Sequence, residues 1–359
     1  MSHILSIGTA TPGYRISQKH VSDFIISNLT LSHTDQRKLQ LLFENSGIEQ
    51  RYTCVPDYTG SMSGEGFFPA EKSGTFPGIG ERVKYYFNVA PQLCVDAVQQ
   101  CEHADVLLNK VTHLITVSCT GMAAPGLDLM LMRALNLPLH TQRSSVNFMG
   151  CYASMHALKT ASYICRADPS ALVLIVSAEL CSLYFRNSPD WNNLSSSVLF
   201  SDGAAACFVG NPSAIESPNS PRLELASFYS EIIPAKDDDM AWEISSDSFL
   251  MRLSSYVPQL IKEGIKPVIN RALHAAKTDQ HNIAHWALHP GGKKILDFIA
   301  MEMNLAASQI EHSYASLRNF GNMSSASILF ILGDVLRVAE RDQTIFAAAF
   351  GPGLTVETA

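Results

Sequence analysis

Short, almost purely apolar runs recur along the chain, at intervals that leave room for helices between them. A run of this kind bounded by turn signals is typical of a strand that is buried on both faces. Such strands occur in parallel or mixed sheets that helices cover on either side. The predicted strands are Ile4–Ile7, Val111–Val117, Ala171–Ala178, Ala204–Val209, Ile283–Leu288 and Thr344–Phe350. The sequence therefore predicts an α/β protein.

Helical patterns follow several of these runs. Tyr152–Arg166 and Ser325–Glu340 are predicted helices, and the first stops before Pro169. A third predicted helix spans Tyr256–Lys277. Pro267 lies inside it and predicts a kink, because proline removes a backbone hydrogen bond from the helix.

The length of 359 residues is too great for one small core and suits one large unit or two fused halves. Asn211–Pro221 carries three prolines between strand-rich regions, so we predict two α/β halves, 1–212 and 213–359. No short repeat is visible, so any duplication would be structural only. Asp57–Gly80 is rich in Gly, Ser and Pro with interleaved phenylalanines, and we expect a long ordered loop there.

The charge and cysteine pattern excludes several classes of protein. A net charge of −7 argues against broad binding to nucleic acids or anionic membranes, although a local basic patch can still hold a small polyphosphate. None of the eight cysteines forms a CxxC pair, and no Cys/His cluster has the spacing of a metal site. No apolar stretch is long enough to span a bilayer, and the start of the chain does not resemble a signal peptide. We expect a reduced, cytoplasmic protein without a membrane segment.

Cys151 follows Gly150 directly and precedes an apolar helix. The N–H groups and positive dipole at a helix start stabilise a thiolate, and glycine permits the sharp turn. A small core residue at a helix start gives the same pattern. The setting makes Cys151 a candidate nucleophile.

His289 follows the run Ile283–Leu288 and precedes Pro290-Gly291-Gly292. The carboxyl end of a buried strand is where α/β sheets place reactive groups. Most histidines lie on the surface or in the core, but of the twelve present only His289 has this setting.

Two further segments complete the set. Asn322, in Gly321-Asn322-Met323-Ser324, opens an apolar helix, where asparagine is an ordinary N-cap but also a possible donor to a thioester oxygen. Phe350-Gly351-Pro352-Gly353 is either a tight turn or a backbone cradle beside a pocket.

In this order the motifs resemble those of the type III polyketide synthases, the chalcone-synthase-like enzymes of the thiolase fold. The similarity extends from Gly8-Thr9-Ala10-Thr11-Pro12 to Leu354-Thr355-Val356-Glu357-Thr358. It implies a five-layered αβαβα subunit of two pseudo-equivalent halves, and a homodimer.

The resemblance also implies roles for individual residues. Cys151, His289 and Asn322 match the catalytic triad. The matching substrate-binding positions are Phe200 as aromatic gatekeeper, Cys119 as the second cavity thiol of several bacterial members, Tyr184 and Ser324 as cavity-lining residues, Met251 (with Phe249 competing) as a second gatekeeper, and Gly351, Pro352 and Gly353 as the cradle.

The chain departs from the plant enzymes at two places. Ala349 precedes Phe350-Gly351 where those enzymes have glycine. Lys38, Leu41 and Asn45 stand where they carry three basic residues near the pantetheine entrance. Since only Lys38 keeps the charge, a carrier protein rather than coenzyme A is a possible donor of the starter.

The implied reaction is an iterative, decarboxylative Claisen condensation of malonyl-CoA onto an acyl starter held on Cys151. We expect a Cys151 thiolate stabilised by protonated His289, with His289 and Asn322 donating to the enolate oxygen formed when CO₂ leaves. The product is a pyrone or a phenol, and no metal, nicotinamide or flavin is needed. Starter identity, number of extensions and cyclisation mode stay open.

Three rival interpretations share part of the pattern. A ketoacyl synthase III of fatty-acid synthesis has the same triad and fold, but its histidine and asparagine segments differ. A papain-like protease also runs Cys, His, Asn, but its cysteine signature is absent. A catalytically silent thiolase-fold partner would lack the nucleophile.

Overall fold

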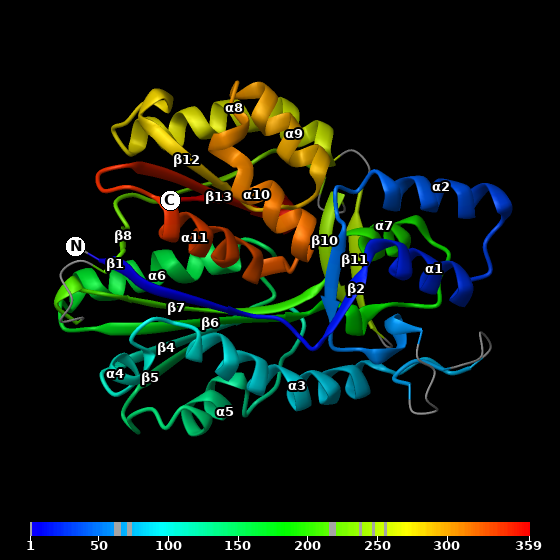
Figure 1. The fold of residues 1–359 in the computed structure, drawn as a ribbon, viewed down its shortest axis with the longest axis horizontal. Helices are drawn as coiled ribbons and strands as arrows, with labels where there is room; N and C mark the ends of the chain where they lie inside the picture. Colours follow the sequence, from blue (N-terminus) through cyan, green and yellow to red (C-terminus); the bar gives the residue numbers. More distant parts are fainter. Residues whose placement is uncertain are drawn as a thin grey trace.

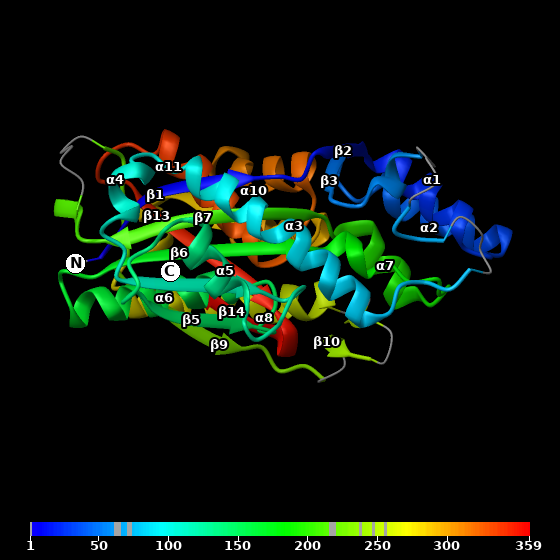
Figure 2. The same cartoon turned by 90° about the horizontal axis from the view of Figure 1, so that it is seen from below.

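The computed structural model describes residues 2–60, 66–69, 74–214, 220–236, 239–245, 248–254 and 257–359. Two sheets and three helical layers alternate through the molecule, with a smaller lobe at one end (Figures 1 and 2). This arrangement is the five-layered αβαβα architecture that the resemblance implies.

The first sheet is built by residues before position 225. Its strands, in order across the sheet, are β5 (Gln142–Asn147), β4 (His113–Ser118), β6 (Leu172–Leu180), β7 (Asp202–Gly210), β1 (His3–Ala10) and β8 (Leu223–Glu224). β4 is parallel to β5 and β6, whereas β7 is antiparallel to both β6 and β1.

The second sheet repeats this arrangement with later parts of the chain. Its strands are β12 (Ile283–Leu288), β13 (Thr344–Gly351), β14 (Thr355–Thr358) and β9 (Tyr229–Ile232). β12 is parallel to β13, and β14 is antiparallel to both β13 and β9. The order β12-β13-β14-β9 therefore matches β4-β6-β7-β1 strand by strand, so the two halves are pseudo-equivalent although the sequence shows no repeat. The division at 212/213 stays a prediction.

Helices fill the layers around the two sheets. One outer layer holds α3 (Ile79–Gln99), α4 (Ala104–Leu108) and α5 (Leu127–Ala134); the middle layer holds α6 (Ala153–Ala167) and α11 (Ser327–Val338); the other outer layer holds α8 (Val257–Ala275), α9 (Lys293–Glu302) and α10 (Ala307–Phe320). The end lobe contains α1 (Gln18–Asn28), α2 (His33–Glu44), α7 (Trp191–Leu199), the pair β2 (Tyr14–Ser17) and β3 (Gln50–Thr53), and the hairpin β10 (Met240–Ile244) and β11 (Phe249–Leu253).

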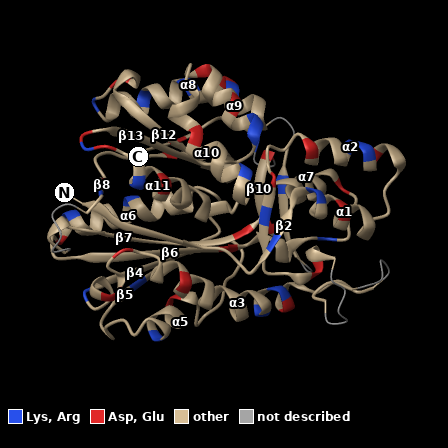
Figure 3. Ribbon diagram, viewed as in Figure 1, with Lys and Arg blue, Asp and Glu red and all other residues tan. Residues whose placement is uncertain are grey.

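Alternation along the strands explains the layers. In β6, Leu174 and Val176 face the outer core with α3, whereas Val173 and Ile175 face the middle core with α6 and α11. In β12, Trp286 faces the core of the opposite outer layer and Ala287 the middle core. Burial on both faces is why these strands read as continuous apolar runs. Charged residues of both signs lie mainly on the helices and loops around the sheets (Figure 3).

The predicted elements are confirmed with small shifts at their ends. All six predicted strands and the helices at α6 and α11 are present. The helix predicted over 256–277 is α8, which continues through Pro267; residue 256 lies outside the described residues.

The segment predicted as a long loop, Asp57–Gly80, is described only in part. Asp57 accepts hydrogen bonds from the N–H groups of Phe67 and Phe68, each at 2.9 Å, and Ile79 already begins α3. Residues 61–65 and 70–73 of that loop, and 215–219 of the predicted boundary, lie outside the described residues.

Candidate active site

Cys151 lies in the turn between β5 and α6, in the middle layer. Gly150 has φ +84°, and a Cβ there would lie 2.1 Å from Cδ of Pro352, so only glycine fits between the two segments. The Cys151 side chain is 4% exposed and lines a pocket between the end lobe and the middle layer. The predicted backbone setting of Cys151, a glycine turn just before a helix, is confirmed, whereas its role as nucleophile stays a prediction.

The turn after β13 packs directly against this segment. A Cβ on Gly351 would lie 2.5 Å from the ring of Tyr152 and 3.3 Å from the backbone N of Cys151. Pro352 reaches the pocket, whereas Gly351 and Gly353 are not on its wall. The segment Gly351-Pro352-Gly353 therefore packs against the backbone of the turn that carries Cys151.

Asn322 is oriented by its own chain. Its Oδ1 accepts a hydrogen bond of 2.8 Å from the N–H of Ser324, so the NH₂ is the end of the amide that can donate to another group. The Cys151 thiol donates to Oγ of Ser324 at 3.5 Å. Burial raises the pKa of Cys151 to about 12, and hydrogen bonds with Ser324 and Asn322 oppose that rise. The structure thus brings Cys151, Asn322 and Ser324 together.

His289 directly follows β12, as predicted, and its backbone N–H donates to the carbonyl of Ala348 at 2.8 Å. The ring is 1% exposed, and neither ring nitrogen has a hydrogen-bond partner among the described residues. Burial lowers the pKa of His289 to about 3. Burial thus disfavours the charged form of both groups, and the expected thiolate–imidazolium pair stays a prediction.

Pseudo-equivalence relates His289 to another predicted residue. Cys119 follows β4 as His289 follows β12, and these two strands occupy matching places in their sheets. Sγ of Cys119 accepts a hydrogen bond of 3.0 Å from the N–H of Gly150, so Cys119 contacts the turn that carries Cys151. The duplication thus places one functional candidate after each of the two matching strands.

The pocket encloses about 980 Å³, part of it open to solvent. Most of the predicted substrate-binding residues lie on its wall: Cys119, Tyr184, Phe200, Met251, Ser324 and Pro352, together with Phe249 and Cys151. His289 and Asn322 are buried and are not on the wall. Lys38 lies outside the pocket on α2, with Nζ 5.9 Å from the ring centre of Trp191.

Glu179 is a buried polar residue near the site that the sequence analysis did not identify. It is fully buried at the end of β6, where it accepts hydrogen bonds from the Cys119 N–H at 3.0 Å, from Oγ1 of Thr120 at 2.7 Å and from Oγ of Ser325. Burial raises the pKa of Glu179 to about 7. A single acid in the apolar run Leu172–Leu180 was the available signal.

Trp242, on β10, was also missed. Its Nε1 donates to the carbonyl of Cys119 at 2.9 Å, and its ring lies edge-on to Phe249. Phe249 stacks on Tyr184 with ring centres 4.5 Å apart. These three rings form one aromatic wall of the pocket.

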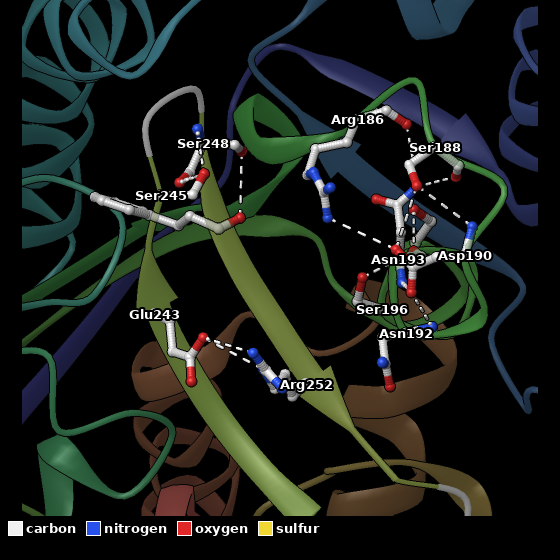
Figure 4. Close-up of polar contacts among 12 residues, drawn as sticks. Arg186, Ser188, Asp190, Asn192, Asn193, Ser196, Glu243, Ser245, Ser248 and Arg252 are labelled. Atoms are coloured by element: carbon white, nitrogen blue, oxygen red, sulfur yellow. Dashed lines mark hydrogen bonds and ion pairs between the residues drawn. The ribbon is translucent and has the colours of Figure 1, made fainter. Parts of the chain in front are cut away.

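Polar contacts stabilise two segments that contribute residues to the pocket wall, the start of α7 and the β10–β11 hairpin (Figure 4). In the first segment, Asp190 caps α7 by accepting from the Asn192 N–H at 2.9 Å, and Arg186 forms an ion pair with Asp190 at 3.7 Å. In the second, Glu243 and Arg252 pair across the β10–β11 hairpin at 3.2 Å. Each set of contacts therefore stabilises its own segment and does not join the two segments.

Neither a metal-binding cluster nor a membrane-spanning helix is found in the part of the chain that the structure describes. No group of three His, Cys, Asp or Glu side chains there could hold a metal ion. No helix there is both long and apolar enough to cross a bilayer.

Comparison with known proteins decides the family. The N-terminal domain profile of the chalcone and stilbene synthases matches residues 1–213, and the C-terminal domain profile of the same enzymes matches residues 224–359. The chain belongs to the chalcone and stilbene synthase family. It is a type III polyketide synthase, a malonyl-CoA-dependent condensing acyltransferase, and the ketoacyl synthase III alternative is not supported.

Individual relatives agree with this assignment. "Alpha-pyrone synthesis polyketide synthase-like Pks18" of Mycobacterium tuberculosis is 29% identical over 99% of this chain and 89% of its own length. "Probable polyketide synthase 1" of Dictyostelium discoideum is also 29% identical over 99% of this chain, which spans only 11% of that longer protein. The solved C-terminal type III domain of Steely1, a type I/III hybrid from Dictyostelium, has a TM-score of 0.89 at 26% identity, covering 99% of this chain and 98% of that one. The synthase therefore has the thiolase-like fold.

Proposed function

We propose that Cys151 is the nucleophile of this synthase and that Asn322 and His289 stabilise the charge formed from malonyl-CoA. The observation that carries this proposal is the orientation of Asn322, whose oxygen is engaged by Ser324 while its NH₂ end is left beside the Cys151 thiol. A fixed donor in a buried site acts on a developing oxyanion without reorganising first.

Loading of the starter is the first step. The Cys151 sulfur attacks the carbonyl carbon of the acyl thioester, and the carrier thiolate leaves. Because Cys151 starts as a thiol and His289 as a neutral imidazole, His289 accepts the thiol proton and passes it to the leaving thiolate. The product is an acyl group covalently bound to Cys151.

Extension follows on the same thiol. Malonyl-CoA loses CO₂, and the electron pair of the broken C–C bond forms an enolate whose oxygen accepts from Asn322 and His289. The enolate carbon attacks the acyl group on Cys151 and releases the Cys151 thiolate. That thiolate then attacks the thioester carbonyl of the longer chain, the CoA thiolate leaves, and the chain is again bound to Cys151. Ring closure to a pyrone or phenolic product ends the cycle, as the name of the mycobacterial relative suggests for that enzyme.

The starter donor is either an acyl-CoA or an acyl-carrier protein. Lys38 is the one base that remains of the expected set, and Leu41 and Leu42 beside it on α2 are exposed. We also propose a cytoplasmic homodimer. The edge position of β5, which pairs only with β4 among the described strands, supports the dimer because its outer backbone groups can pair with a second copy.

The direct assay of the proposed function uses purified protein, radiolabelled malonyl-CoA and a panel of acyl-CoA and carrier-bound starters. We expect at least one starter to give labelled polyketides of defined mass. CO₂ release without any extended product from any starter would contradict the proposed activity.

The neutral resting state predicts a pH dependence. A pKa raised above its ordinary value leaves Cys151 protonated at neutral pH, and only the thiolate is alkylated. We therefore expect the rate of Cys151 alkylation by iodoacetamide, measured by peptide mass mapping, to rise about tenfold per pH unit between about pH 6 and 9. A rate that stays constant over that range would show that the ion pair already exists.

Tyr184 is predicted to limit the size of the product. Its hydroxyl donates to the carbonyl of Thr120 at 2.6 Å, and its ring stacks on Phe249. Tyr184→Ala removes the ring from the pocket wall, so we expect longer chains or bulkier starters, with malonyl decarboxylation retained. Products are identified by mass.

The matched control is Tyr184→Phe, which keeps the ring volume and loses only the hydrogen bond to Thr120. We expect this control to keep the original products. Since truncating a buried aromatic costs about 3–5 kcal/mol, circular dichroism must confirm the fold of the alanine variant. Unchanged products from folded Tyr184→Ala would mean that this residue does not bound the cavity.

A further inference from the structure

Arg51 is a buried charge at the junction of the end lobe and the active site. It lies on β3 and is 3% exposed. Its Nη1 donates to the carbonyls of Ser197 and Phe200, at 2.9 and 2.6 Å, which lie at the C-terminal end of α7. A cation at this end of a helix satisfies open carbonyls and meets the negative end of the helix dipole. Arg51 therefore stabilises the turn that carries the predicted gatekeeper Phe200.

The same turn is bonded to the segment that carries Asn322. The backbone N–H of Asn322 donates to the carbonyl of Leu199 at 3.0 Å, and the N–H of Ser201 donates to the carbonyl of Asn322 at 2.9 Å. Phe200 and Asn322 thus form an isolated parallel bridge between two loops. A shift of the turn would move the Asn322 backbone with it.

Arg51 also contacts this segment directly. Gly321, which precedes Asn322, has φ +71°, and a Cβ there would lie 3.0 Å from Cδ of Arg51 and 3.2 Å from the carbonyl oxygen of Leu199. The alkyl stem of Arg51 is therefore in close contact with the backbone beside Asn322. Its guanidinium donates to the carbonyls at the C-terminal end of α7.

A purely structural role explains Arg51 poorly. Its Nε and Nη2 have no hydrogen-bond partner among the described residues. Burying a charge with unsatisfied donors is expensive, and an apolar residue of similar size usually gives equal or better stability. The donors that are satisfied hold one end of α7, which is the end that contacts Asn322.

We propose that Arg51 is a positioning residue for malonyl decarboxylation, which fixes Asn322 by clamping the last turn of α7. This inference rests on the proposed role of Asn322. Arg51 lies on the pocket wall, but among the described residues it donates only to backbone carbonyls and not to the side chain of Cys151, His289 or Asn322. It holds the backbone bridge between Phe200 and Asn322 in place, so that the amide of Asn322 stays aligned with the enolate oxygen.

The experiment compares starter loading and CO₂ release in single turnovers of Arg51→Met, Arg51→Lys and the unaltered enzyme. We expect Arg51→Met to slow CO₂ release by about 10–100-fold, because small displacements of a catalytic group cost rates of that order. Loading should fall less than about threefold. Arg51→Lys, which keeps the charge, should recover part of the loss.

Arg166→Met is the matched control. Nη2 of Arg166 also donates to two backbone carbonyls, those of Leu225 and Ala226, each at 3.2 Å. It lies near the C-terminal end of α6, roughly 20 Å along the helix from Cys151 at 1.5 Å per residue. The ratio of CO₂ release to loading should be unchanged in Arg166→Met. An equal fall of both rates in Arg51→Met, or no fall, would overturn the positioning role.

A double-mutant cycle separates this inference from the role of Asn322 itself. If Arg51 acts through Asn322, Arg51→Met should lower CO₂ release less than about threefold in the Asn322→Ala background. Full, independent losses from the two substitutions would reject the coupling. If Asn322→Ala alone leaves CO₂ release intact, the proposed function of Asn322 fails instead, whatever Arg51 does.

Discussion

Cys151→Ala should lower polyketide formation by a factor on the order of 10⁴ or more, the scale seen when a covalent nucleophile is removed. The reason is that no acyl chain can be held for the enolate to attack. Malonyl-CoA decarboxylation should persist, since the donors proposed for that step, Asn322 and His289, are untouched. Product formation and CO₂ release are measured on the same samples.

Cys94→Ala is the matched control for this substitution. Cys94 is a buried cysteine of α3 that lies in the outer core, away from the pocket wall. The Cys94→Ala enzyme, if it folds, should form products at the rate of the unaltered enzyme. Extended products from Cys151→Ala at a comparable rate would mean that another group carries the chain.

Asn322→Ala should slow malonyl decarboxylation by about 10²–10³-fold, the usual cost of removing one oxyanion donor. Starter loading should change only a few fold, because the amide serves the enolate oxygen rather than the thiol. Single-turnover loading and CO₂ release separate the two steps. Equal losses in a folded variant would contradict the assigned role.

Asn322→Asp tests the donor itself. An aspartate keeps an oxygen that can accept from the Ser324 N–H, as Oδ1 of Asn322 does at 2.8 Å. When it is ionised, however, it has no hydrogen-bond donor. We expect a loss of decarboxylation at least as large as in Asn322→Ala. Normal decarboxylation by Asn322→Asp would show that only the shape of the side chain matters.

Much of the fold could be predicted because two-sided burial leaves a clear pattern. β6 and β7 are buried at every position, and most of their residues are apolar. β5 lacks such a signal, since Gln142–Asn147 is a largely exposed edge strand. The structural duplication was invisible for a related reason: matching strands share burial and connection but not sequence.

The site was predictable where backbone geometry demanded particular residues. Gly150 and Gly351 allow the two turns beside Cys151 to approach each other, and both appear as motifs. Glu179, Trp242 and Arg51 could not be found in this way, because their roles depend on contacts between distant segments. The burial that disfavours the charged forms of Cys151 and His289 could not be predicted either, because it depends on the whole fold.

The most direct measurement of the central claim is the location of the acyl chain. The enzyme is incubated with an acyl donor, quenched and digested, and the modified peptide is identified by mass. We predict that the acyl adduct is on Cys151, the thiol at the start of α6. An adduct confined to Cys119, another thiol of the pocket wall, would contradict it.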